Sequence, residues 1–205
     1  MKFKMLVLWV AFACVMRDFM IDPIDRLYFQ NPWRPLVGIR NTLIDILFGD
    51  IGDEYTYRRL WMVHTEWNTI RNAFVIGEPM AKKCYFHDMD EWFDHSENYY
   101  YYKVDDFPAV KNLLDEIPSV DTSTAVFSVI DGPMTIPVHR AESNLQLRYH
   151  LTLEGDGDCI LHLADGRSHK HVTGEHILFD HSKSHSLVKF GTGRRVVLIL
   201  DVNRF

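Results

Sequence analysis

The strongest constraint on the fold of this chain is a rhythm of short apolar runs that begins near residue 120 and continues to the C-terminus. Turn-forming residues such as Asp131-Gly132-Pro133 and Gly191-Thr192-Gly193 separate the runs. The pattern predicts six strands, at residues 124–130, 145–153, 159–163, 176–179, 186–190 and 195–202. Short strands joined by tight turns are typical of an antiparallel barrel or sandwich.

The segment before this strand region, residues 21–119, is expected to be a helical and irregular buttress on the substrate side of the core. Apolar residues at helical spacing predict helices over residues 41–48 and 54–74. Another helix is expected after Asp105-Asp106-Phe107-Pro108, because acidic residues and an early proline favour a helix start. The aromatic run from Tyr99 to Tyr102 is interpreted as packing, with a lining of the substrate groove as the alternative.

The first twenty residues form a third segment, with twelve consecutive apolar residues at positions 5–16. This run is shorter than the roughly 20 residues that a membrane-spanning helix needs. It resembles the apolar part of a signal peptide, with Ala11-Phe12-Ala13 as a cleavage site, or a monotopic membrane anchor over residues 5–21. The alternative is an apolar helix packed on the core. The localisation expected is therefore membrane-associated or cytoplasmic.

Charge and cysteine content exclude other classes of protein. The formal net charge of −6 argues against a nucleic-acid binding protein, which needs clustered Lys and Arg. The three cysteines are far apart in the chain, so they indicate neither a disulfide framework nor a thiolate metal site. No sequence signal indicates an oligomeric state.

Histidine is the residue that points to chemistry, because eight of the eleven histidines fall between positions 139 and 185. His139 follows a turn and His185 begins a late strand. In a double-stranded β-helix, the jelly-roll barrel of cupins and oxygenases, ends of strands distant in sequence converge, so these two imidazoles can meet on one metal ion. His169 and His171 are interpreted as solvated turn residues, and His176 as a packed or hydrogen-bonded core residue.

Two arginines accompany the histidines. Arg148 and His150 lie two positions apart and therefore on the same face of one strand. Arg195 enters an apolar strand, where an unpaired buried charge is very costly, so it needs an anion or a carboxylate partner. A dicarboxylate cosubstrate would supply that partner, and a structural ion pair is the alternative.

Together these residues resemble the aspartyl/asparaginyl β-hydroxylase family of Fe(II)/2-oxoglutarate dioxygenases, which includes the lipid A hydroxylases. The resemblance covers about residues 120–205 and rests on the motifs Ile136-Pro137-Val138-His139, Leu147-Arg148-Tyr149-His150-Leu151, Gly174-Glu175-His176-Ile177-Leu178-Phe179-Asp180, then His185, Arg195 and Leu200-Asp201-Val202. It implies a mainly β fold with N-terminal helices, in which residues 120–205 form a double-stranded β-helix of antiparallel strands.

The resemblance also implies the roles of individual residues in a hydroxylase that uses Fe(II), 2-oxoglutarate and O2. His139 and His185 would ligate the iron, and Arg195 with Ser128 would hold the distal carboxylate of 2-oxoglutarate. His150 would contact the cosubstrate near the metal, and Arg148 would face the cosubstrate or the substrate as a third catalytic residue.

The chain departs from the family pattern in two places, and these leave the substrate open. Ala141 stands where lipid A hydroxylases have an acidic iron ligand. The peptidyl hydroxylases also lack that acidic ligand. Gln146-Leu147-Arg148 lacks the second arginine that peptidyl hydroxylases tend to have. The ending Asp201-Val202-Asn203-Arg204 and the apolar N-terminus resemble the lipid A branch, so a lipid acyl chain is the first expectation. The alternatives are a peptidyl Asp/Asn hydroxylase, a non-catalytic cupin-like binding module and a zinc-dependent hydrolase.

Overall fold

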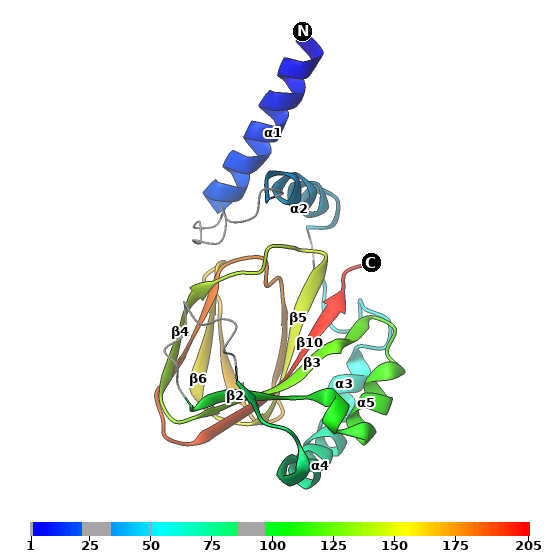
Figure 1. Cartoon of the computed structure of the whole chain (residues 1–205), viewed down its shortest axis with the longest axis vertical. Helices are drawn as coiled ribbons and strands as arrows, with labels where there is room; N and C mark the ends of the chain where they lie inside the picture. Colours follow the sequence, from blue (N-terminus) through cyan, green and yellow to red (C-terminus); the bar gives the residue numbers. More distant parts are fainter. Residues whose placement is uncertain (1, 22–33, 50, 86–96) are drawn as a thin grey trace.

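The computed structural model describes residues 2–21, 34–49, 51–85 and 97–205, and its centre is a pair of antiparallel sheets that face each other (Figure 1). The large sheet has the order β1 (Cys84–Tyr85), β2 (Tyr99–Lys103), β3 (Val120–Asp131), β10 (Arg194–Asn203), β5 (Gln146–Glu154) and β8 (His176–Phe179). The small sheet has the order β4 (Met134–His139), β9 (His185–Lys189), β6 (Asp156–Leu163) and β7 (Ser168–Val172).

The chain passes back and forth between the two sheets from β3 to β10. Strands β3, β5, β8 and β10 lie in the large sheet, and β4, β6, β7 and β9 lie in the small one. All the pairings are antiparallel. This winding is a double-stranded β-helix, which confirms the predicted fold class.

All six predicted strands are present, but the sequence pattern missed others in the same region. Strand β4 was missed because it carries Pro137, which is tolerated there since β4 is an edge strand of the small sheet. Strand β7 was missed because its residues are mostly polar, and the interpretation of this stretch as a turn with solvated histidines is wrong for His171, which is fully buried.

The helices lie on the outside of the barrel and at one end of it (Figure 1). They are α1 (Lys2–Ile21), α2 (Arg34–Phe48), α3 (Trp61–Thr65), α4 (Trp67–Gly77) and α5 (Pro108–Asp115), with 3-10 turns η2 (Glu78–Met80) and η4 (Val104–Asp106). Among the described helices, none is long and apolar enough to cross a membrane. Parts of the predicted 21–119 buttress, at residues 22–33, 50 and 86–96, lie outside the described residues. The division into segments 1–20, 21–119 and 120–205 stays a prediction.

The single helix predicted over residues 54–74 is in fact two helices that start later. Arg59 has a φ of 63°, in the left-handed region, so a right-handed helix cannot run through it. Helix α3 therefore begins at Trp61, and a non-helical conformation at Glu66 separates it from α4. The apolar spacing was still informative, because Leu60, Ile70 and Phe74 are fully buried.

The large sheet has one apolar and one polar face because side chains alternate along each strand. Its outer face packs against α3, α4 and α5, and it holds most of the hydrophobic core. On β10, Val196, Leu198 and Leu200 belong to this core, whereas Arg195, one position away from Val196, hydrogen-bonds across the barrel interior. The interior core is much smaller, with Ile130, Ile136, Cys159 and Leu187.

The aromatic run in β2 follows the same alternation. Tyr100 and Tyr102 join the outer core, where Tyr102 packs edge-on against Phe74 and Phe107. Tyr99 packs against the interior cluster instead and is hydrogen-bonded to Ser128. The run is therefore a strand whose two faces meet different environments. The interpretation of it as packing describes Tyr100 and Tyr102 but omits the hydrogen bond of Tyr99 in the barrel interior.

The outer core predicts a large effect for one substitution on the central strand. Leu198→Ala on β10 should lower the free energy of unfolding by about 2–5 kcal/mol, because a fully buried leucine leaves a cavity. Chemical denaturation monitored by circular dichroism measures the change. The matched control is Leu43→Ala on α2, where the side chain is 53% exposed and the loss should stay within about 0.5 kcal/mol. Equal losses for the two variants would contradict this description of the core.

Candidate metal and anion site

His139 and His185 lie directly opposite each other where β4 pairs with β9. Their ring centroids are 4.3 Å apart. The Nδ1 atom of His139 lies 2.8 Å from the carbonyl oxygen of Pro137, and that of His185 lies 2.9 Å from the carbonyl oxygen of Lys183. A carbonyl only accepts hydrogen bonds, so each Nδ1 carries the proton and each Nε2 carries the lone pair.

The electrostatics of the site favour a neutral imidazole at His185. Burial, and after it the neighbouring His139, lower the pKa of His185 to about 3. A neutral imidazole with its lone pair on Nε2 is the form that binds a metal ion, and backbone acceptors on Nδ1 commonly orient such ligands. Two histidines from one strand pair can therefore hold one metal ion. The structure brings them together as the sequence predicted, and their role as ligands stays a prediction.

Arg195 lies deeper in the barrel, with only 2% of its surface exposed. Its Nη1 donates to the hydroxyl of Ser128 at 2.9 Å, and its Nε donates to Nδ1 of His171 at 3.2 Å. In the part of the chain that the structure describes, no carboxylate forms an ion pair with this guanidinium. A buried positive charge surrounded by neutral groups is a strong candidate for binding an anion.

Several polar atoms on β5 and β7 are buried without a hydrogen-bond partner among the described residues. They are Nε2 of His171, Oγ1 of Thr152 and both ring nitrogens of His150. Because Nδ1 of His171 accepts from Arg195, its Nε2 must carry a proton and is a donor. Burial holds the pKa of His150 and of His171 well below the usual range, so both rings are neutral. Buried groups of this kind normally have partners, so their convergence indicates a polar ligand in the barrel.

Arg148 faces the interior with His150, but it already has a carboxylate partner. Asp201 lies opposite it on β10, and its Oδ1 accepts from Nε and Nη2 of Arg148 at 3.1 and 2.9 Å. Nδ1 of His181 lies 3.7 Å from the same oxygen, and burial lowers the pKa of His181 to about 2. Asp201 therefore holds Arg148 in place, and the predicted contact of Arg148 with cosubstrate or substrate stays a prediction.

The position two residues after His139 supplies no metal ligand. Ala141 has no donor atom in its side chain, and its backbone N–H donates to the carbonyl oxygen of His181 at 2.9 Å. The carbonyl oxygen of the next residue, Glu142, accepts a hydrogen bond from Asn41 on α2. The described site thus offers two imidazoles for a metal and a separate arginine for an anion.

A comparison with models of protein families matches the model described as aspartyl/asparaginyl beta-hydroxylase over residues 86–205, which is more than half of the chain. The chain belongs to the aspartyl/asparaginyl β-hydroxylase family. The resemblance inferred from the histidine and arginine motifs is thereby confirmed. Membership of this family supports a hydroxylase-type dioxygenase as the class of enzyme.

Solved structures and curated proteins add little to the family assignment. A prolyl-4-hydroxylase from Pseudomonas putida is 12% identical, with 68% of this chain and 88% of that chain covered and a TM-score of 0.43. A Cnp3 cupin domain from Schizosaccharomyces pombe is also 12% identical, with 42% and 57% covered and a TM-score of 0.34. Likeness at this level says nothing about the reaction. A search of the curated proteins found no match.

Three residues of this family member's site were not found from the sequence. His171 was assigned to a solvated turn, although its spacing of two from His169 is compatible with a strand. Tyr99 was grouped with the rest of its aromatic run. Asp201 was noted only as part of a terminal motif, and its pairing with Arg148 joins residues 53 positions apart, which no local pattern reveals.

The Arg148–Asp201 pair predicts a measurable loss of stability in this hydroxylase. Asp201→Ala should lower the free energy of unfolding by about 1–3 kcal/mol, because it leaves a partly buried guanidinium without its charged acceptor. Asp165→Ala is the matched control, since the Arg167–Asp165 pair is exposed and should contribute about 0–1 kcal/mol. Urea denaturation of both variants gives the comparison, and a loss at Asp165 as large as that at Asp201 would contradict it.

Proposed function

We propose that this chain is an Fe(II)- and 2-oxoglutarate-dependent hydroxylase that acts on an acyl chain of a membrane lipid. The observation that carries the cosubstrate is Arg195, which is buried among neutral groups. The distal carboxylate of 2-oxoglutarate would be the anionic partner of Arg195. A guanidinium is suited to this task because its planar fork of N–H donors matches a carboxylate.

The residues present fit both groups. Nε2 of His139 and of His185 are imidazole donors of the type that Fe(II) accepts, and a two-histidine set leaves coordination positions for other ligands. The orphaned donors and acceptors of His150, Thr152 and His171 fit a molecule with several oxygen atoms. When bound, Fe(II) with 2-oxoglutarate and O2 supplies the oxidising power for hydroxylation of an unactivated C–H bond, with succinate and CO2 as the other products.

The chain's own residues would divide the remaining work. Arg195, Ser128 and the Nε2–H group of His171 would hold the cosubstrate by its distal end. His150 would contact it nearer the metal, and Asp201 keeps Arg148 oriented toward the same space. Fixing these groups before binding lowers the entropic cost of aligning the reactants.

Helix α2 connects this site to the N-terminal helix. Its Asn41 donates through Nδ2 to the carbonyl oxygen of Glu142 at 2.7 Å, in the loop that follows His139. Its Asp45 accepts from Asn144 at 2.9 Å and from Lys183 at 2.7 Å, in the loops that flank both histidines. The two helices therefore lie at the end of the barrel where His139 and His185 are found (Figure 1).

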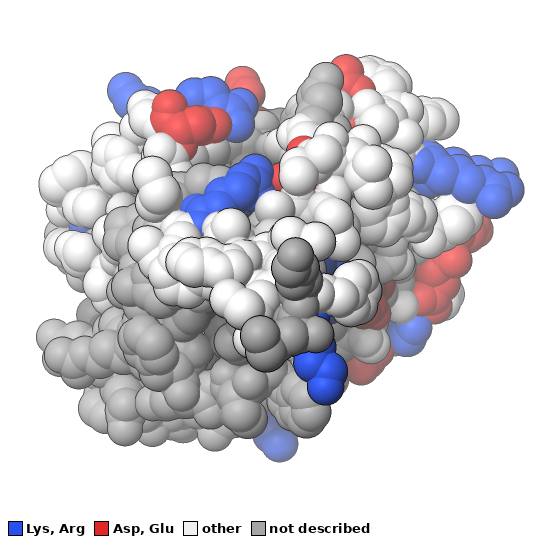
Figure 2. Space-filling view, turned by 90° about the horizontal axis from the view of Figure 1, so that it is seen from above, with Lys and Arg blue, Asp and Glu red and all other residues white. Residues whose placement is uncertain are grey.

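Helix α1 extends away from this end of the barrel (Figure 1). Six consecutive residues are each more than half exposed: Met5, Leu6, Val7, Leu8, Trp9 and Val10. Viewed from above, much of the described surface is neither acidic nor basic (Figure 2). Exposed apolar surface of this extent favours contact with a membrane, from which an acyl chain would reach the barrel.

Iron and cosubstrate binding can be tested by anaerobic titration. Fe(II) plus 2-oxoglutarate should produce the weak visible charge-transfer band of the chelate in the wild-type protein, and O2 should then yield succinate. His139→Ala should abolish both signals. Arg195→Ala should raise the 2-oxoglutarate concentration needed by about 30-fold or more, the equivalent of truncating a buried charged contact.

Arg194→Ala is the matched control, because the neighbouring arginine pairs with Glu78 and lies over the ring of Phe74 on the outer face. It should leave the 2-oxoglutarate requirement within about twofold of wild type, since its partners lie outside the barrel. Absence of both band and succinate in the wild-type protein would exclude the oxygenase and favour a non-catalytic binding module. An unchanged requirement in Arg195→Ala would show that the anchor is assigned wrongly.

The acyl-chain substrate predicts membrane binding through α1. The double variant Leu8→Glu, Trp9→Glu should weaken binding to phosphatidylethanolamine/phosphatidylglycerol vesicles at least about tenfold, because each substitution removes a large exposed apolar side chain. It should also reduce the mass-spectrometric yield of acyl chains carrying one added oxygen. Phe190→Glu is the control, since Phe190 is 66% exposed but follows β9 at the opposite end from His185.

Vesicle flotation and product analysis separate the substrates. A wild-type protein that does not bind vesicles, leaves the lipids unchanged and adds oxygen to an Asp- or Asn-containing peptide would contradict the lipid proposal and support the peptidyl hydroxylase.

A further inference from the structure

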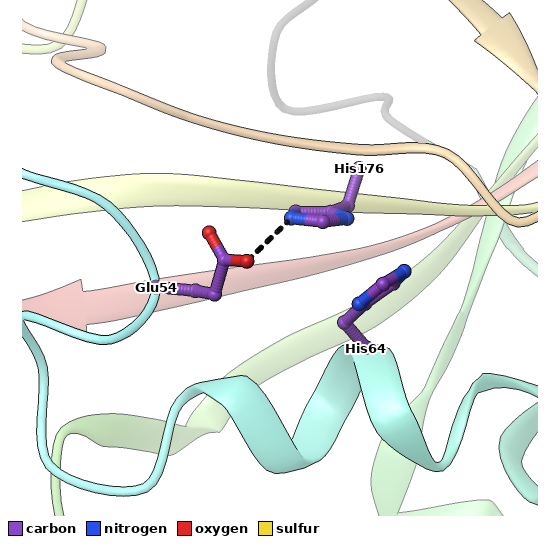
Figure 3. Close-up of side chains that lie close together, drawn as sticks. All are labelled: Glu54, His64 and His176. Carbon is purple, nitrogen blue, oxygen red and sulfur yellow. Dashed lines mark ion pairs between the residues drawn. The ribbon is translucent and has the colours of Figure 1, made fainter.

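A second cluster of potential metal ligands lies outside the barrel, between the large sheet and the helical layer (Figure 3). Glu54 comes from the turn segment before α3, His64 from α3, and His176 from the first position of β8. Their side chains point toward one another from these three segments (Figure 3). His176 cannot belong to the barrel site, because it stacks on Tyr149 of the outer core.

The cluster is already close to the spacing that a metal ion requires. One potential ligand atom from each residue lies within 4.8 Å of the other two. Nε2 of His176 and Oε1 of Glu54 are 3.3 Å apart, and the two imidazole rings have centroids 4.2 Å apart. Ligand atoms of a tetrahedral zinc ion lie about 3.4 Å apart, so a small rotation of the His64 side chain would complete the set.

A buried hydroxyl beside the cluster is an independent observation. Tyr149 is fully buried, and its Oη has no hydrogen-bond partner in the described ranges. Its ring stacks on that of His176 at 5.4 Å between centroids. Burial raises the pKa of Tyr149, and the negative charge of Glu54 raises it further. An unsatisfied buried hydroxyl calls for a polar partner such as a bound water.

We propose that Glu54, His64 and His176 bind a divalent transition-metal ion of the zinc class at a site separate from His139 and His185. Two imidazoles and one carboxylate are an established zinc donor set, and a fourth position remains for water. A metal-bound water is a suitable partner for the hydroxyl of Tyr149. The Glu54 side chain is 16% exposed and that of His176 is 20% exposed, so solvent and metal can reach the site.

The metal would join three segments that lie far apart in the chain. β8 is the edge strand of the large sheet, and it leads through residues 180–184 to His185. The ion would fasten this edge strand to α3 and to the turn that carries Glu54. It would therefore stabilise the folded chain, because an ion that binds only the native state shifts the unfolding equilibrium by mass action.

The test uses the full-length chain with the barrel site disabled. Metal-stripped His139→Ala protein is titrated with Zn²⁺ against a chromophoric chelator, and its melting temperature is followed in parallel. We expect one bound equivalent of Zn²⁺ and a rise in melting temperature. Adding His64→Ala should weaken Zn²⁺ binding at least about tenfold and remove the thermal shift. His162→Ala is the control, since this exposed histidine bonds Ser168 on the other sheet and should change neither reading.

The variant Glu54→Gln separates a loss of metal binding from a loss of folding. Glutamine keeps the size of the side chain and an uncharged oxygen near Nε2 of His176, so the metal-free protein should melt as wild type does, whereas its Zn²⁺ affinity should fall at least about tenfold. If His139→Ala protein binds no equivalent of Zn²⁺, or if His64→Ala and Glu54→Gln leave its affinity unchanged, the cluster is an ion pair only and the proposal is wrong.

Discussion

The alternation of side chains along β5 and β10 is the constraint on which the rest of the structure depends. Each of these two central strands buries both of its faces, but in opposite environments. The outer residues, such as Leu151 and Leu198, meet the helices in an apolar core that can stabilise the chain without help from the interior. The barrel interior therefore does not have to be apolar for the chain to fold. It can hold Arg195 and His150, whose burial in an apolar core would be very costly.

The main apolar core and the candidate site therefore lie on opposite faces of the large sheet. The helices α3, α4 and α5 cover the apolar side, and the small sheet covers the polar side. The two clusters of histidine follow the same division. His139 and His185 line the barrel, whereas His64 and His176 lie under the helical layer. A shift of one position along a strand moves a side chain from one face of the sheet to the other. Tyr149 lies in the outer core, whereas the next residue, His150, lies in the barrel near His171.

Much of this arrangement was predictable from the sequence, and each failure has its own physical cause. The turn signals and apolar runs located six strands, because those strands contribute to an apolar core on at least one side. β7 was not recognised, because its inward residue is His171 rather than an apolar side chain. The spacing of His139, Arg148, His185 and Arg195 indicated a common site, but the carboxylate that orients Arg148 depends on register between distant strands. The boundaries of the helix predicted over residues 54–74 failed because the backbone at Arg59 is left-handed.

The position of Asp45 has a mechanical consequence. Its carboxylate accepts from Asn144 and Lys183 in the two loops beside the barrel histidines, and it lies 3.9 Å from Nη1 of Arg17 on α1. One side chain thus forms a joint between the apolar helix and both loops at the barrel end. Tilting of α1 would move Arg17 relative to the carboxylate that also accepts hydrogen bonds from the segments next to His139 and His185.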